Sequence, residues 1–122
     1  MQTILIFCPN PTARTALSRH FLDAGHYQRL YAENFRLVVS LALNNEIYLV
    51  VLFDPSQAWL LTKLKDFLRK RCNRMRVCIP PSRGQNLRED WRDIVNDELK
   101  PLRQRNRSTL RSHPRFQWKP NT

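Results

Sequence analysis

The chain has 122 residues, 42% of them hydrophobic, and its 21 Lys+Arg against 10 Asp+Glu give a formal net charge of +11. This length suits one domain with a single core. Only two glycines are present, which argues against a glycine-rich phosphate loop and against an all-β meander of tight turns. The positive charge predicts a polyanionic partner: nucleic acid first, then an acidic protein or an anionic surface.

The first part of the chain predicts a strand, a helix and a second strand. Residues 3–8 form an apolar run, and Asn10 and Pro11 after it suit the N-cap and the first position of a helix. Apolar residues then recur at helical spacing until Gly25, a typical C-terminal stop. Residues 27–32 follow as a shorter strand.

Residues 34–43 are compatible with either a helix or a strand, because their apolar density hides the period. The β-branched Val38 and Val39 favour a strand. Asn34 as a cap and Asn44-Asn45 as a turn favour a helix. We expect a helix here and keep the strand as the alternative.

Residues 47–53 are the most informative stretch, because a continuous apolar run is typical of a strand buried on both faces of a parallel sheet. Asp54 follows at the end where ligands of open α/β sheets bind. Asp54, Pro55 and Gln57 also fit a capping box for the next helix. We interpret Asp54 first as this cap, and second as an acid that binds metal or accepts phosphate.

The second half of the chain predicts two more helices around a fourth strand. The apolar stripe of the first helix is expected to be Leu60, Leu61, Leu64, Phe67 and Leu68. Residues 75–79 read as the strand, and residues 82–85 as a loop. Asn86 is expected to cap the last helix, whose core face would be Leu87, Trp91, Ile94, Val95 and Leu99.

The alternation of strands and helices predicts an α/β fold: a small, doubly wound, mostly parallel sheet of about four or five strands flanked by helices, of the flavodoxin type. The domain is expected over residues 1–101. Residues 102–122 carry basic residues and no acid, with Ser, Asn, Pro and Gln between them. This composition predicts a flexible basic tail.

Three segments carry a family resemblance: Thr-Ile-Leu-Ile-Phe-Cys-Pro-Asn-Pro near the N-terminus, Tyr-Ala-Glu-Asn at 31–34, and Tyr-Leu-Val-Val-Leu-Phe-Asp-Pro at 48–55. Their order over residues 1–82 resembles the receiver domain of bacterial response regulators. The family's Mg²⁺-binding acidic pair falls near Cys8 and Pro9, its phospho-acceptor on Phe53, and its switch Thr/Ser near Pro80 or Pro81. The resemblance therefore implies a degenerate pseudo-receiver without phosphotransfer, and by family analogy a possible homodimer.

The polar residues of the chain predict no catalytic residue, metal site or cofactor. The histidines His20, His26 and His113 lack zinc-ligand spacing with each other or with cysteine. Clustered carboxylates of the kind used by two-metal nucleases are not visible, so a small metal-dependent nuclease is the least favoured interpretation. The opening residues do not resemble a signal peptide and no run is long enough to span a bilayer. We expect a reduced, cytoplasmic, bacterial protein without a membrane partner.

The basic residues predict a non-enzymatic regulatory or accessory protein that binds DNA or RNA through sequence-independent phosphate contacts. Phe116 and Trp118 in the tail are candidates for stacking on unpaired bases. The alternative is an interaction module that docks on an acidic protein. The predicted nucleic-acid-binding residues are Lys63, Lys65, Arg69, Lys70, Arg71, Arg74, Arg76, Arg83, Arg103, Arg105, Arg107, Arg111, Arg115 and Trp118.

Overall fold

A computed structural model describes residues 2–23, 27–72 and 75–100 of the chain. Its elements in chain order are β1 (Gln2–Phe7), α1 (Pro11–Asp23), β2 (Tyr27–Ala32), α2 (Phe35–Asn44), β3 (Leu49–Leu52), the 3-10 turn η1 (Pro55–Gln57), α3 (Ala58–Arg71), β4 (Arg76–Cys78), β5 (Ser82–Arg83), β6 (Asn86–Leu87) and α4 (Trp91–Leu99). The predicted strands and helices are therefore present over the described ranges, with ends shifted by a few residues. The proposed stop at Gly25 and the tail lie outside these ranges.

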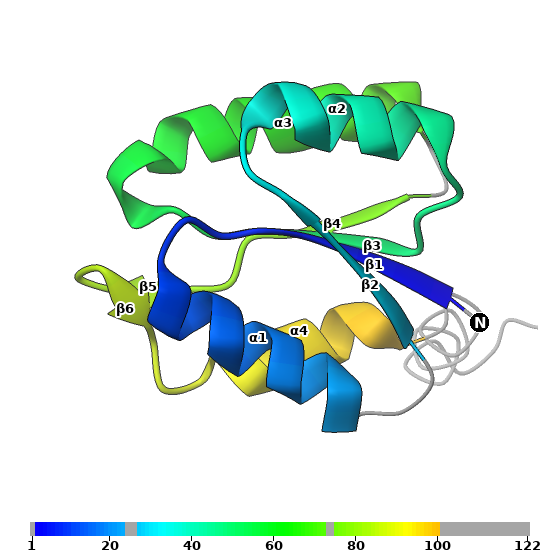
Figure 1. Cartoon of the computed structure of the whole chain (residues 1–122). Helices are drawn as coiled ribbons and strands as arrows, with labels where there is room; N and C mark the ends of the chain where they lie inside the picture. Colours follow the sequence, from blue (N-terminus) through cyan, green and yellow to red (C-terminus); the bar gives the residue numbers. More distant parts are fainter. Residues whose placement is uncertain (1, 24–26, 73–74, 101–122) are drawn as a thin grey trace, which may run out of the picture.

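The main sheet has four parallel strands in the order β2-β1-β3-β4. This order matches the first four strands of the flavodoxin-type arrangement 2-1-3-4-5. The helices α1 and α4 cover one face of the sheet, and α2 and α3 cover the other (Figure 1). The predicted α/β fold with a parallel sheet flanked by helices is confirmed.

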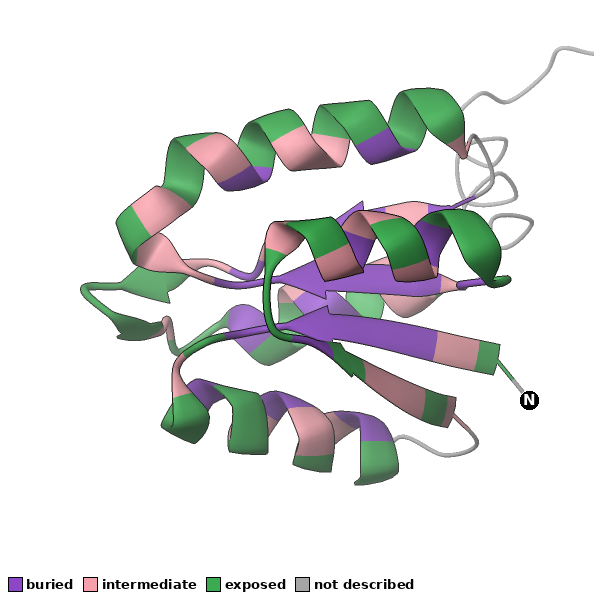
Figure 2. Ribbon diagram, turned by 45° about the horizontal axis from the view of Figure 1, so that its top comes forward, coloured by how far each residue is buried: buried purple, intermediate pink, exposed green. Residues whose placement is uncertain are grey.

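Successive residues of the central strands face opposite cores, which explains their unbroken apolar runs. Ile4 and Ile6 of β1 pack with α1 and α4, whereas Leu5 and Phe7 pack with α2 and α3. All four residues of β3 are buried. Figure 2 shows the buried strands between helices whose outer surfaces are exposed. Both faces of the sheet are thus covered by helices. A ligand or partner can bind at the outer faces of the helices or at the ends of the strands.

The choice between helix and strand at residues 34–43 is settled in favour of the helix. The Asn34 Oδ1 accepts a hydrogen bond of 2.9 Å from the Leu37 backbone N–H, so Asn34 caps α2 as predicted. Val38 is fully buried in the core under α2. Tertiary burial of this face outweighs the strand preference of a β-branched residue. The expected cap of α1 is confirmed as well, since the Asn10 Oδ1 accepts a hydrogen bond of 2.9 Å from the Thr12 N–H.

Asp54 lies at the N-cap position of the 3-10 turn η1, with Pro55 after it as predicted, but the predicted capping box does not form. The Asp54 side chain makes no bond to a backbone N–H; it accepts 2.7 Å from the Ser56 hydroxyl and 2.6 Å from the Gln57 amide. Pro55 has no N–H to offer, and the backbone first makes the 3-10 turn η1, so that α3 begins only at Ala58. Both oxygens of the Asp54 carboxylate therefore accept hydrogen bonds from side chains of its own loop.

The predicted loop at 82–85 and the cap at Asn86 are also wrong. Ser82–Arg83 and Asn86–Leu87 pair as an antiparallel hairpin, β5-β6, around Gly84, whose φ is 61°. A positive φ suits glycine in such a turn. The last helix consequently begins at Trp91. The residues expected to face the core do so. Trp91 and Val95 of the helix are buried, and Ile94, Leu99 and the strand residue Leu87 pack against the same cluster.

Candidate functional site

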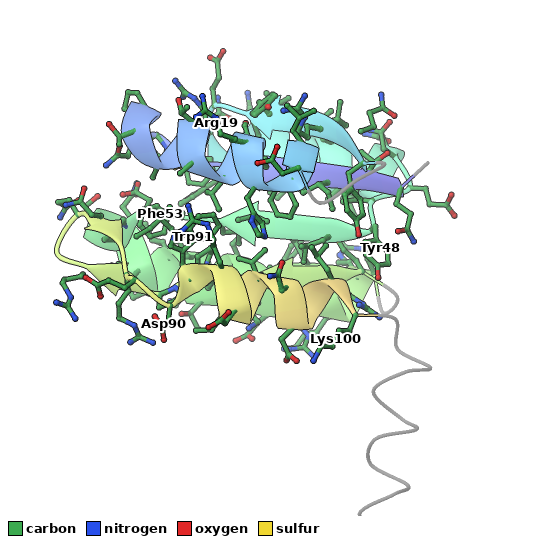
Figure 3. All side chains as sticks on the ribbon, turned by 90° about the horizontal axis from the view of Figure 1, so that it is seen from below. Arg19, Tyr48, Phe53, Asp90, Trp91 and Lys100 are labelled. Atoms are coloured by element: carbon green, nitrogen blue, oxygen red, sulfur yellow. The ribbon has the colours of Figure 1, made fainter. Side chains whose placement is uncertain are left out.

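The carboxyl ends of β1 and β3 meet at the point where the strand order reverses, which is the usual ligand position in this kind of sheet. Toward β3 this position is filled with apolar side chains, whereas toward β2 a hollow of about 590 Å³ is lined by Cys8, Arg14 and Glu33 among others. Phe53 and Cys8 are buried in one cluster with Trp91. The Phe53 N–H donates 2.9 Å to the Phe7 carbonyl, so Phe53 extends β3 and turns its ring inward. Figure 3 shows Phe53 beside Trp91.

The two cysteines at this end are buried and stay protonated at neutral pH. Desolvation raises the pKa of the Cys8 thiol to about 11 and that of Cys78 to about 12. The Cys8 thiol donates a weak hydrogen bond of 3.4 Å to the Asn10 carbonyl. Thiols in this state are poor nucleophiles. Over the ranges 2–23, 27–72 and 75–100, no group of three or more His, Cys, Asp or Glu could hold a metal ion.

The most distinctive polar surface is the outward side of α3. Leu61 and Leu68 are its buried residues. Trp59, Lys63 and Lys70 each lie two residues from one of these leucines, which is about 200° around a helix. They therefore point away from the core. Trp59 is 63% exposed and Phe67 is 39% exposed.

Each of these two aromatic rings carries a cation four residues further along α3. The Lys63 Nζ lies 4.9 Å from the centre of the Trp59 ring, and the Arg71 Cζ lies 5.3 Å from the Phe67 ring. Residues four apart are neighbours on a helix surface. We call Trp59, Lys63, Phe67, Lys70 and Arg71 the α3 ladder.

The predicted basic residues of α3 are brought together along this helix. Lys63, Arg69, Lys70 and Arg71 are exposed and Lys65 is half-buried. Within the described part of the chain, no ion pair involves any of these five cations. Their charge is therefore available to a partner.

Arg76 does not share this surface. Its guanidinium donates 3.1 Å to the Tyr48 hydroxyl and 2.7 Å to the Glu98 carbonyl, and it also donates to the Lys100 carbonyl. It lies 5.0 Å from the Tyr48 ring centre. An arginine is well suited to satisfy carbonyls at a helix C-terminus. Arg76 thus joins the end of α4 to the start of β4.

Arg83 and its neighbour Arg88 lie at the other end of the sheet, in and after the hairpin. Arg83 pairs with Glu89 at 3.1 Å, and Arg88 holds both carboxylate oxygens of Asp90, at 2.6 and 2.7 Å. This contact lowers the pKa of Asp90 through hydrogen bonding and charge. The Asn10 amide donates 3.2 Å to the Gln85 carbonyl, which places the hairpin beside the end of β1. These arginines are far from the basic last turn of α3, and each already forms an ion pair with a neighbouring carboxylate.

The remaining predicted residues lie outside the described ranges. They are Arg74, Arg103, Arg105, Arg107, Arg111, Arg115 and Trp118. The described chain ends at Lys100, which Arg76 holds at the start of β4. The C-terminal end of α3 lies at the same edge, because the Met75 N–H donates 2.9 Å to the Cys72 carbonyl just before β4 begins. The last described residue, Lys100, therefore lies at the end of the sheet where α3's cations are densest.

Sequence reasoning missed Trp59 and misplaced Phe67, which it assigned to the core stripe. The signal for Trp59 was present in the sequence: once Leu61 and Leu68 are taken as inward positions, residue 59 must face outward. A small hollow of about 300 Å³ between α1 and α4, lined by Arg19, His20, Asp23 and Arg92 among others, was also missed. Its mixed charge gives it no clear preference for an anion.

Comparisons with known proteins identify no family. No protein-family model matches the chain, and neither a curated protein nor a solved structure matches it. No helix in the described ranges is both long and apolar enough to cross a membrane.

Proposed function

We propose that this chain is a non-enzymatic accessory or regulatory protein that binds nucleic acid through the cations of α3 and the basic sequence after residue 100. The single observation that supports this most is that α3's five Lys and Arg residues are free of ion pairs within the described ranges. Cations held close to phosphates release the counterions of the polyanion, and this release supplies most of the sequence-independent affinity.

The receiver-like arrangement of strands fits the same proposal. We propose that the chain is a degenerate pseudo-receiver in which Cys8 and Phe53 replace the acidic residues of the phosphorylation site. Both side chains are buried among apolar neighbours, so the carboxyl end of the sheet contributes to stability. The outer face of α3 would then carry the interaction.

The test is the salt dependence of binding to random-sequence DNA and RNA, measured with the full chain. Each phosphate contact adds about 0.9 to the slope of log K against log salt for duplex DNA and about 0.7 for single strands. The variant Arg69→Gln/Lys70→Gln/Arg71→Gln is expected to lower the slope by about 2 to 3. A chain that shows no salt-dependent binding would overturn the proposal.

The hairpin offers a matched control for this experiment. Arg83→Gln/Arg88→Gln also removes cations, but these two are already paired with Glu89 and Asp90. The control is expected to keep nearly the full slope of the unaltered chain. If both variants reduce the slope equally per charge removed, the binding depends on net charge alone and α3 is no defined interface.

A second candidate function is docking on an acidic protein, and the exposure of Trp59 favours it. Tryptophan and arginine dominate the energetic centres of protein interfaces, and the α3 ladder contains both types. An acidic partner would compete with nucleic acid for the same face. Loss of nucleic-acid binding from the α3 variant, together with retained binding of an acidic protein, would exclude a shared site.

A further inference from the structure

We infer that the α3 ladder binds unpaired bases, so that the chain selects single-stranded nucleic acid over duplex. This inference rests on the proposed function and adds to it the class of ligand. It depends on Trp59 and Phe67 rather than on the charge of α3.

The exposed aromatic residues of α3 differ from the other large apolar side chains on the surface. Among the described residues, Leu22, Tyr31 and Leu43 are also exposed. Only Trp59 and Phe67 lie on one helix with a cation over each ring, at 4.9 and 5.3 Å. An aromatic ring beside a cation suits a nucleotide, because the base can stack on the ring while the cation contacts the phosphate.

The spacing along α3 suits a short strand. Trp59 and Phe67 are eight residues apart on a regular helix, a rise of about 12 Å. Stacked nucleotides advance about 3.4 Å along one strand, so this rise spans roughly three to four of them. Lys63 lies between the two rings in sequence and Lys70 follows the second. A strand of about four nucleotides could therefore stack at both ends of the ladder and contact cations between them.

The cation over each ring does not prevent stacking. An exposed cation–π contact favours its geometry by only about two- to fivefold, whereas stacking a base on an aromatic ring raises affinity by about 5- to 150-fold. The flexible Lys63 ammonium can move from the indole to a phosphate when a base arrives. Replacing the cation–π contact with base stacking therefore favours binding of the nucleotide.

A duplex cannot use the same rings. Its bases already stack on each other and leave mainly phosphates and groove edges to a protein surface. The α3 face would hold a duplex through its cations alone. The difference in affinity between single strand and duplex, at matched salt and length, then measures what Trp59 and Phe67 contribute.

The experiment compares a labelled oligothymidine of twelve nucleotides with a duplex of the same length, using the full chain and its Trp59→Ala and Phe67→Ala variants. We expect each variant to lose about 5- to 150-fold in affinity for the single strand and little for the duplex. Leu43→Ala is the matched control, because Leu43 is an exposed apolar residue of α2, 46% exposed. Thermal unfolding of each variant checks that the fold is intact.

The outcomes separate this inference from the proposed function. If the unaltered chain binds both nucleic acids with a steep salt slope and Trp59→Ala and Phe67→Ala bind the single strand as well as Leu43→Ala does, the inference is wrong and phosphate binding stands. If the chain binds neither nucleic acid at low salt, both proposals are wrong and an acidic protein becomes the leading partner. A selective loss of single-strand affinity in Trp59→Ala or Phe67→Ala supports both.

Discussion

The helices α3 and α4 follow neighbouring strands but lie on opposite faces of the sheet, and their charges are used differently. The cations of α3 form no ion pair within the described ranges. Around α4, the acidic residues Glu89, Asp90 and Asp97 pair with Arg83, Arg88 and Lys100. The basic residues of this chain are therefore of two kinds. Those of α3 can bind a partner, whereas those near α4 mostly balance local carboxylates.

The tryptophans of the two helices differ in the same way, because one is exposed and the other is buried. Trp59 is the second residue of α3 and is 63% exposed, whereas Trp91 is the first residue of α4 and is 4% exposed. Each has a cation over its ring, Lys63 at 4.9 Å and Arg92 at 4.7 Å. Trp91 also contacts the His20 ring at 5.1 Å, and His20 is held by Asn96 at 2.8 Å. One indole therefore stabilises the core and the other faces solvent.

The largest expected effect contrasts these two tryptophans. Trp91→Ala removes a buried ring from the core that contains Phe53 and Val95, and we expect it to lower the free energy of unfolding by about 3–5 kcal/mol. Trp59→Ala is expected to change it by no more than about 0.5 kcal/mol. Urea denaturation measures both. Similar losses would mean that Trp59 also has a structural role.

Alkaline pH is expected to destabilise the core between the sheet and the helices α1 and α4, by an amount that grows with pH. The pKa values of Cys8 and Cys78 are raised from 9.0 to about 11 and about 12. The unfolded thiols therefore lose their protons first, and stability falls by about 1.4 kcal/mol per pH unit for each thiol as pH rises above its unfolded pKa. This contribution is fully present below pH 9 and is lost as pH rises through 11 and 12. Cys8→Ala/Cys78→Ala is expected to show a shallower loss between pH 9 and 11, measured by denaturation, and an unchanged slope would contradict the assignment.

A smaller effect is expected from the contact that closes α4. Arg76→Met keeps a stem of similar length but removes the donors to the Glu98 and Lys100 carbonyls. The bond to Glu98 is partly buried and the bond to Lys100 is exposed, so water can reach these carbonyls in the variant and the expected loss of stability is about 0.5–1.5 kcal/mol. Amide hydrogen exchange should accelerate in the last turn of α4 and remain unchanged in α3. Uniform acceleration across both helices would contradict a local role for Arg76.

The smallest expected effect concerns the exposed pair of Arg88 and Asp90. Exposed ion pairs contribute little to stability, so Arg88→Gln should leave the thermal midpoint nearly unchanged. The lowered pKa of Asp90 depends first on its hydrogen bond from Arg88. NMR titration should therefore find that the Asp90 carboxyl of the variant protonates at a higher pH than in the unaltered chain. An identical titration would show that the pair does not persist in solution.

The parallel sheet could be predicted because its strands are short, unbroken apolar runs with helical segments between them. The strand predicted at residues 27–32 has the same bounds as the observed β2. The hairpin at residues 82–87 could not be predicted in the same way, because its strands are two residues each and carry no period. The hairpin also has a tertiary contact, the bond from the Asn10 amide to the Gln85 carbonyl. Such contacts have no local signature in the sequence.

The candidate site shows a similar division. The cations of α3 were visible as a cluster in the sequence, but the fate of Arg76 was not, since two of its partners are backbone carbonyls. A carbonyl is present at every residue and gives no sequence signal. The Asp54 carboxylate was misread because Ser56 and Gln57 could either extend a cap or occupy the acid, and the 3-10 turn decided for the second.

The position of the nucleic-acid site can be measured by an NMR titration of the full chain with an unlabelled oligothymidine, following the indole N–H signals of its three tryptophans. The claim is that the α3 face, and not α4, holds nucleic acid. It predicts that the Trp59 signal and the backbone amides of α3 shift in proportion to the oligonucleotide bound, while the Trp91 signal and the amides of α4 stay in place. Shifts confined to α4, or the absence of any shift along α3 at saturation, would contradict it.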